Sequence, residues 1–112
     1  MGQPLILKRA EMNALSLLFK ALSNKHRLKI LNILRNGPKN VGEIADSLDA
    51  EQTVVSHNLK CLTFCGLVTA RRDGKTRVYA LNHDTLEPIL RLADRHISDY
   101  AGNLRYCKTL ER

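Results

Sequence analysis

One short segment of the chain places four polar side chains on the same side of a helix. Residues Gln52–Phe64 contain Val55, Leu59 and Leu62 at the spacing of one apolar stripe. At about 100° per residue, the opposite half presents hydrogen-bonding or cationic side chains, namely Thr53, Ser56, His57 and Lys60. Such groups can distinguish the donor and acceptor patterns that base pairs present in the major groove of DNA. The segment is therefore predicted to be a DNA-recognition helix.

The residues before this segment predict a second short helix that would hold it in place. Val41–Leu48 contains apolar residues at helical spacing, and the stretch Asp49–Glu51 then breaks the pattern. Two short helices joined by a tight turn form a helix-turn-helix, whose second helix enters the major groove. Gln52 and Thr53 stand at the start of that second helix, where they either cap it or contact DNA.

Two β-type segments follow and end in a cluster of cations. Leu67–Arg72 and Lys75–Leu81 are predicted strands, and Asp73-Gly74 between them is typical of a two-residue hairpin turn. The cations near the hairpin tip are Arg71, Arg72, Lys75 and Arg77. Such a cluster can be an ordinary solvated surface. Beside a recognition helix it favours a wing that lies along the minor groove or its phosphates.

Two helices are predicted before the helix-turn-helix. The first covers Ala10–Leu22 and the second begins near Ser23, a good N-cap residue, and ends at Gly37-Pro38. Their apolar residues at helical spacing are Leu15, Leu18, Phe19 and Leu22 in the first helix, and Leu28, Leu31, Ile33 and Leu34 in the second. Both helices are expected to bury these faces.

A last helix is predicted after the hairpin. It starts at Asp84 or Thr85 and tolerates Pro88 in its first turn. Its apolar stripe is longer than a small domain can cover by itself, and comprises Leu86, Ile89, Leu90, Ala93, Ile97, Ala101 and Leu104. The sequence thus predicts one mostly α domain over residues 1–112 with a small β-hairpin wing. The predicted order α-α-α-α-β-β-α is that of a winged helix-turn-helix.

Composition agrees with a nucleic-acid partner. The 112 residues contain 18 Lys and Arg against 11 Asp and Glu, a net charge of +7. Such a surplus favours polyanions, with nucleic acid first and an anionic membrane surface second, or merely aids solubility. No apolar run approaches the roughly 18 residues of a membrane span, and Leu5–Leu7 is too short for a signal-peptide core. Three cysteines without a CxxC pair fit a reducing compartment, so we expect a cytoplasmic protein.

Several motifs together resemble the ArsR/SmtB family of winged-helix repressors. The matching stretches are KALSNKHRLKILNILRNGP, VGEIADSL, TVVSHNLKCL and GLVTARRDGKTRVYAL. They cover about Phe19 to Leu81, in the order and spacing of that family. The resemblance implies a homodimer, built from the first and last helices, that binds an imperfect palindrome in operator DNA. It also implies release of the DNA when an inducer binds, usually a metal or metalloid ion.

The inducer sites familiar from this family are degraded in the chain. Arsenic-sensing relatives often have a Cys-x-Cys pair where this sequence has Glu43–Asp46. Zinc-sensing relatives have an Asp and three further ligands in the last helix. Asp84 matches the first, but the other places are occupied by Leu86, Ile97 and Tyr100. One residue out of that frame, His83, His96 and Asp99 have the family's mutual separations, and three ligands are the fewest a zinc site uses.

The cysteines offer another site for an inducer. Cys61 and Cys65 are four residues apart and share one face of the predicted recognition helix, and Cys107 follows the last apolar stripe. Thiolates bind soft ions such as As(III), Cu(I) or Cd(II), and paired thiols can sense oxidants or persulfides. A small buried cysteine is also a common packing residue, so both a sensor and a structural role stay open.

Other classes of function are weighed against DNA binding. A winged helix can serve protein–protein contact, but its exposed face should then be apolar or acidic, whereas this one is polar and basic. A DNA-binding regulator without any ligand is a further alternative. No glycine-rich phosphate loop and no motif-placed Ser/His/Asp or Cys/His set occurs in the sequence, so we expect no enzymatic activity.

Overall fold

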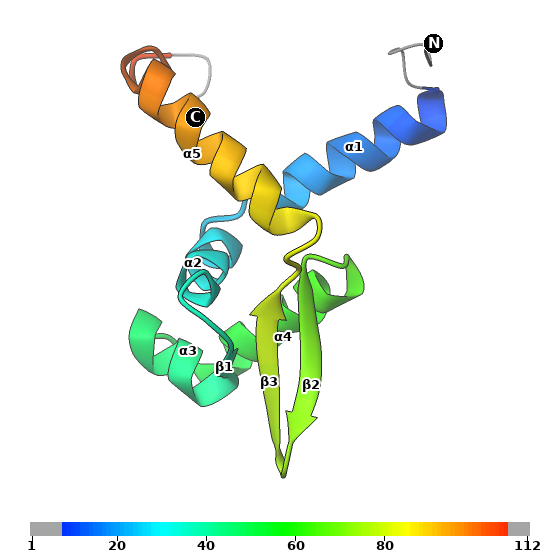
Figure 1. Ribbon diagram of the computed structural model, residues 1–112, viewed down its shortest axis with the longest axis vertical. Coiled ribbons are helices and arrows are strands. Elements are labelled where there is room, and N and C mark those ends of the chain that lie inside the picture. Colours follow the sequence, from blue (N-terminus) through cyan, green and yellow to red (C-terminus); the bar gives the residue numbers. More distant parts are fainter. Residues whose placement is uncertain (1–7, 108–112) are drawn as a thin grey trace. The chain divides into compact units, whose positions relative to one another are not determined.

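The computed structural model describes residues 8–107, so the apolar Leu5–Leu7 lies outside the described part. The helices are α1 (Arg9–Leu22), α2 (Lys25–Leu34), α3 (Val41–Leu48), α4 (Gln52–Phe64) and α5 (Leu86–Arg105). The strands are β1 (Lys39–Asn40), β2 (Val68–Asp73) and β3 (Thr76–Leu81) (Figure 1). Two compact units make up the chain, Met1–Leu81 and Asn82–Arg112, and each is described by itself. The single domain over residues 1–112 stays a prediction.

The helix-turn-helix has the bounds that the sequence predicts. Asn40 caps α3 through a reciprocal pair of hydrogen bonds, in which its Oδ1 accepts from the Glu43 N–H at 2.8 Å and its own N–H donates to Glu43 Oε1 at 2.9 Å. Asp49 ends α3 in the left-handed region, with φ of 50°, which short polar residues tolerate. This single residue turns the chain sharply enough for α4 to begin at Gln52.

The sheet contains a strand that the sequence analysis did not predict. Its order is β1-β3-β2, all antiparallel, and β1 consists of two residues paired with Val78 and Tyr79 of β3. A two-residue strand gives no alternating pattern, so periodicity could not reveal it. The hairpin turn is also shifted by one residue, because Asp73 pairs with Thr76 and leaves Gly74-Lys75 as the turn. Gly74 supplies the positive φ of 65° that such a turn needs.

The predicted start of the second helix is wrong by one residue. Ser23 ends α1, with its hydroxyl donating to the Lys20 carbonyl at 3.0 Å, and Asn24 caps α2 by accepting from the Arg27 N–H at 3.1 Å. The face of α2 differs as well, since Ile30 is buried whereas Leu28 is exposed. Asn is as good an N-cap as Ser, so residue type alone could not place the boundary.

The core of the first unit is built around α4. Val55, Leu59 and Leu62 are each at most 1% exposed, as predicted, and α4 packs against α2 and α3. Residues from other elements that complete this core include Ile30, Leu31, Leu34, Ile44, Ala45, Leu67 and Val68. Burial of these side chains fixes which half of α4 faces solvent.

The outer helices leave apolar side chains uncovered. On α1, Leu15 and Phe19 of the predicted apolar face are exposed in the single chain. On α5, Leu92, Ile97 and Leu104 are exposed, and the backbone at Tyr100 departs from helical geometry, with φ of −124°. Within residues 8–107, no helix combines the length and apolarity needed to cross a bilayer.

Candidate nucleic-acid interface

The solvent face of α4 presents the side chains that the sequence predicts. All five are exposed, namely Gln52, Thr53, Ser56, His57 and Lys60. Thr53, Ser56, His57 and Lys60 lie on the half of the helix opposite Val55, and Gln52 is exposed at the start of α4. Because that apolar stripe is buried, α4 cannot rotate without exposing the core, and its polar face keeps one direction.

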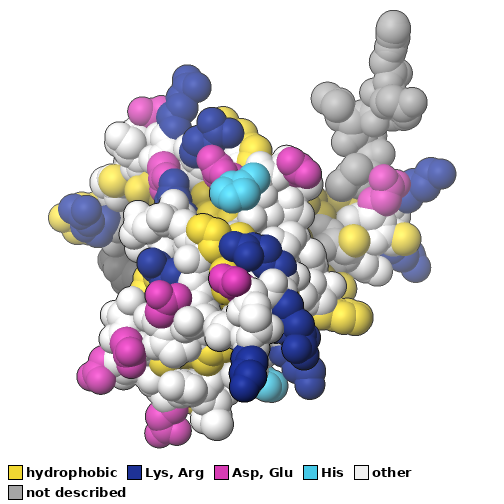
Figure 2. Space-filling model, turned by 60° about the horizontal axis from the view of Figure 1, so that its bottom comes forward, with side chains coloured by type: hydrophobic (Ala, Val, Ile, Leu, Met, Phe, Trp, Pro, Cys, Tyr) yellow, Lys and Arg dark blue, Asp and Glu magenta, His cyan; other side chains and the backbone are white. Residues whose placement is uncertain are grey.

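A groove separates α4 from the sheet and extends the interface beyond the helix. Its walls are Ser56, Lys60, Thr63 and Phe64 from α4, and Ala70, Arg77 and Tyr79 from the two long strands. The structure therefore brings Arg77 of the wing across the groove from Ser56 and Lys60. Figure 2 views the molecule from the side of the wing tip, and on this face Lys and Arg side chains form a column. An exposed cationic column beside polar side chains is the electrostatic pattern of a phosphate-binding surface.

The strand register divides the cations of the wing between two faces. Arg72 pairs with Arg77, two positions from the Ala70–Tyr79 pair, so these residues share the face that lines the groove beside α4. Arg71 pairs with Val78 on the opposite face. The hollow on that face is lined by Pro38, Asn40, Glu43, Arg71, Asp73, Thr76 and Val78. The four cations are all exposed, but they do not form one cluster.

The sequence analysis missed four groove residues, Thr63, Phe64, Ala70 and Tyr79, although spacing gave a signal for Thr63 and Tyr79 in particular. Thr63 lies three residues after Lys60 and seven after Ser56, so helical spacing places it on their face. Tyr79 lies two residues after Arg77 in a strand, so alternation places it on the same face. Tyr79 is 8% exposed and paired with both β1 and β2, which makes it the buried floor of the groove.

Two of the cysteines lie together at the C-terminal end of α4, Cys61 in its last turn and Cys65 as its C-cap residue. Cys61 is half-buried, Cys65 is exposed, and both are free thiols. Desolvation raises the pKa of the Cys65 thiol, and Cys61 raises it further by charge repulsion and a hydrogen bond between the two thiols. The Arg27 guanidinium acts in the opposite direction. Cys107, half-buried, belongs to the second unit.

The residues His83, His96 and Asp99 do not form a metal site within one chain. His83 Nδ1 contacts the Glu87 carboxylate, and His96 stacks on Tyr100 with ring centroids 4.7 Å apart. Since α5 rises about 1.5 Å per residue, His83 lies far along the helix axis from His96. Within residues 8–107, no group of three or more His, Cys, Asp or Glu side chains is arranged to hold a metal ion.

Comparison with known proteins identifies the family. A family model described as bacterial regulatory protein, arsR family, matches residues 24–70, which contain α2 and the whole helix-turn-helix. A probable mercury resistance operon repressor of Streptomyces lividans is 35% identical over 89 residues, which are 80% of this chain and 71% of that protein. The chain belongs to the ArsR/SmtB family. The resemblance found in the sequence motifs is confirmed.

Two other proteins match most of the chain. The transcriptional activator HlyU of Vibrio cholerae is 32% identical over 96 residues, which are 84% of this chain and 89% of that protein. The homodimeric winged helix-turn-helix DNA-binding domain Mb0332 of Mycobacterium bovis superposes with a TM-score of 0.74 at 31% identity, over 89% of this chain and 92% of that domain. The predicted winged helix-turn-helix fold is confirmed.

The raised pKa of Cys65 makes its reactivity testable. We expect Cys65 to react with iodoacetamide more slowly at pH 7 than an unperturbed thiol, because less thiolate is present. The alkylation rate should rise with pH as the thiolate forms, and this rise should occur at higher pH than for an unperturbed cysteine. In a Cys61→Ala chain the rise in rate should move toward lower pH, because the charge repulsion and the hydrogen bond from Cys61 no longer raise the pKa of Cys65. Unchanged pH dependence in that variant would contradict the coupling between the thiols.

Proposed function

We propose that this ArsR/SmtB protein is a sequence-specific DNA-binding transcriptional repressor, acting as a homodimer on operator DNA in the cytoplasm. The observation that supports it most is the exposed polar face of α4, continued across a groove by Arg77 of the wing. A protein-docking winged helix would present an apolar or acidic face at this place. The matched mercury-resistance relative is a repressor, and regulators of this kind bind DNA without catalysing a reaction.

The proposed DNA contacts divide into two kinds. Ser56 and His57, in the N-terminal half of α4, contact base edges in the major groove, together with Gln52 and Thr53. Lys60 lies one turn further along and contacts phosphate. In the wing, the proposed phosphate or minor-groove contacts are Arg72, Lys75 and Arg77, with Arg71 contributing less because it lies on the face turned away from α4.

Replacing Ser56 or His57 should remove sequence discrimination. We expect Ser56→Ala and His57→Ala each to weaken operator binding by about 1 to 3 kcal/mol, with little change for random DNA. Both side chains are exposed, so thermal stability should stay that of the parent. Fluorescence anisotropy with operator and random duplexes measures both affinities. Ser98→Ala, the same change on exposed α5, is the control. Parent-like specificity in either α4 variant would remove that residue from the interface.

The wing contacts should appear in the salt dependence of binding. Each lost phosphate contact should flatten the slope of log K against log salt by about one unit, for operator and random DNA alike. We expect this for Arg77→Ala and Arg72→Ala, and a smaller change for Arg71→Ala, which serves as the matched control on the opposite face. Equal effects of Arg71 and Arg77 would contradict the division into faces. If the variant lacking all four cations has the same slope of log K against log salt as the parent, the wing does not contact DNA phosphates.

The uncovered apolar side chains of the outer helices support a homodimer. Leu15 and Leu18 on α1, and Leu90, Ile97 and Leu104 on α5, are the proposed contacts, of which Leu15, Ile97 and Leu104 are exposed in the single chain. The matched Mycobacterium bovis domain is homodimeric. Two recognition helices related by a two-fold axis would meet successive major grooves about 34 Å apart, so the operator should be an inverted repeat.

Sedimentation at micromolar concentration should show a dimer. Ile97→Asp should shift it to monomer, because a carboxylate would be buried without a partner. Leu92→Asp is the control, since Leu92 is exposed about 200° around α5 from Leu90. A parent chain that sediments as a monomer would contradict the dimer, as would equal dissociation by both substitutions.

We propose thiol chemistry as the inducing event. Cys61 lies in the last turn of α4 and Cys65 is the residue that caps its C-terminal end. The matched Streptomyces lividans protein is named for resistance to mercury, a thiophilic metal. A bond to either thiol would tilt or strain α4. An inducer that prefers this DNA-free geometry shifts the equilibrium by its differential affinity for the two states.

Thiophilic agents and zinc should therefore differ in their effects. We expect As(III) or a mild oxidant to weaken operator binding and zinc to leave it nearly unchanged. The response should be lost in Cys61→Ser/Cys65→Ser, and Cys107→Ser shows whether the third thiol contributes. A double variant that responds as the parent does would refute the role of these thiols. A parent that responds to zinc alone would instead favour His83, His96 and Asp99, contributed by more than one chain.

A further inference from the structure

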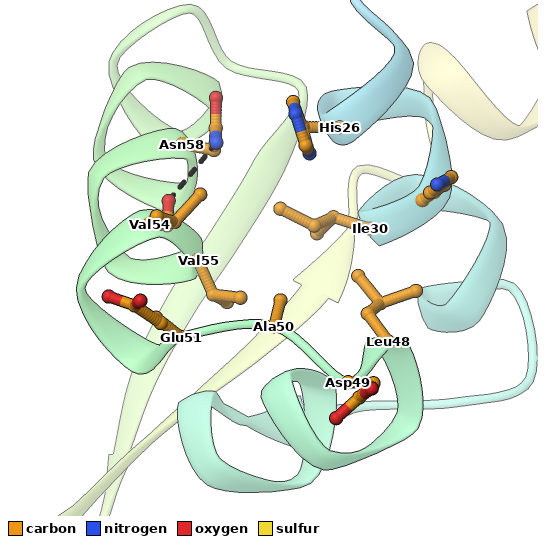
Figure 3. A pocket seen from close by; sticks show the side chains of 10 residues that line it. His26, Ile30, Leu48, Asp49, Ala50, Glu51, Val54, Val55 and Asn58 are labelled. Carbon is orange, nitrogen blue, oxygen red and sulfur yellow. Dashed lines mark hydrogen bonds between the residues drawn. The ribbon is translucent and has the colours of Figure 1, made fainter.

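A pocket of about 320 Å³ lies on the side of α4 that faces α2, away from the proposed DNA contacts. Its walls come from α2, from the turn between α3 and α4, and from the first half of α4. Figure 3 shows the side chains of Ile30, Leu48 and Val55 directed toward its middle, with His26 and Asn58 at one end. This volume lies within the range of small-molecule sites, whose walls are mostly apolar with a few polar groups.

Asn58 is the feature that marks this pocket as a binding site. It is 7% exposed and is the one buried polar residue among the core positions of residues 8–107. Its Nδ2 donates to the Val54 carbonyl of the same helix at 3.0 Å. Its Oδ1 points away from that bond (Figure 3) and has no hydrogen-bond partner among the described residues. Asn58 Oδ1 is not one of the fully buried unpaired atoms, so it is open to a donor that enters the pocket, either water or a ligand.

The charges around the pocket limit what can enter. Asp49 and Glu51 are among the residues that line the pocket, together with one lysine, Lys29. The carboxylates outnumber the fixed cation, so an anionic ligand is repelled more than it is attracted. The apolar interior also disfavours a strongly charged molecule of either sign, because its charge would be desolvated there.

From these features we propose that the pocket binds a small neutral aromatic or aliphatic compound that has one hydrogen-bond donor. The donor pairs with Asn58 Oδ1, the apolar body packs on Ile30, Leu48 and Val55, and the ring of His26 lies at the same end as the donor. The pocket includes Asp49–Glu51, the turn that sets where α4 begins. An occupant therefore touches the segment that positions Gln52 and Thr53. Its role as an effector rests on the proposed DNA-binding function, whereas binding itself does not.

Indole and 1-methylindole are a matched pair of probes for this site. They share an aromatic body, but methylation removes the N–H donor. We expect indole to cause saturable shifts in the ¹H–¹⁵N spectrum of the free protein at amides of the pocket wall, including residues 48–58. Binding of 1-methylindole should be about tenfold weaker, the loss corresponding to one hydrogen bond. Indole-3-carboxylate should also bind more weakly than indole.

Two variants test the same pocket from the protein side. Asn58→Leu removes the acceptor and fills space with an apolar side chain, so it should abolish the shifts. Ala50→Leu narrows the pocket from the turn and should weaken binding with Asn58 intact. Absence of saturable shifts with millimolar indole would overturn the proposal. Equal affinity for indole and 1-methylindole would overturn the role of Asn58.

A measurement with DNA separates the effector role from binding. Operator affinity of the parent should change by at least about threefold when indole saturates the pocket, and Asn58→Leu should show no such change. Saturable shifts with unchanged operator affinity would overturn the effector role. Loss of operator binding in Ser56→Ala alone, with indole shifts intact, would confirm that the pocket and the DNA interface are separate sites.

Discussion

Burial of one apolar stripe on α4 determines the geometry of the whole interface. Val55, Leu59 and Leu62 are almost completely removed from solvent against α2 and α3. Each such side chain contributes about 1.5 to 3 kcal/mol through burial, so rotating the helix to another face would cost most of a small domain's stability. The polar half of α4 therefore faces outward without any contact of its own to hold it there.

The elements with strong periodicity or a strong turn signal could be predicted from the sequence. The bounds of α3 and α4 follow from apolar spacing. The residues of α4 that do not lie on its apolar stripe are the ones predicted to be exposed. The strand β1 could not be predicted, because a two-residue strand exists only through its pairing with Val78 and Tyr79. The boundary between Ser23 and Asn24 also depends on which of two good caps the neighbouring backbone selects.

The sequence predicted which residues belong to the candidate site, but not how they are arranged in space. Alternation along β3 could have separated Arg77 from Val78, but which face turns toward α4 depends on tertiary packing. The groove that joins Arg77 to Ser56 and Lys60 is therefore visible only in three dimensions. The pocket beside Asn58 is similar, since it arises between helices whose sequence patterns each describe only their own faces.

Asn40 has two roles that join the wing to the helix-turn-helix. Its backbone pairs with Val78 in the sheet, and its side chain caps α3. The root of the wing and the first residue of α3 are thus held to each other by one residue. In the proposed DNA complex, this link would keep the distance between the major-groove contacts and the wing contacts nearly constant. Adjustment to a mismatched operator must then come from bending or groove narrowing in the DNA. The protein would in this way select operators by their deformability as well as by their bases.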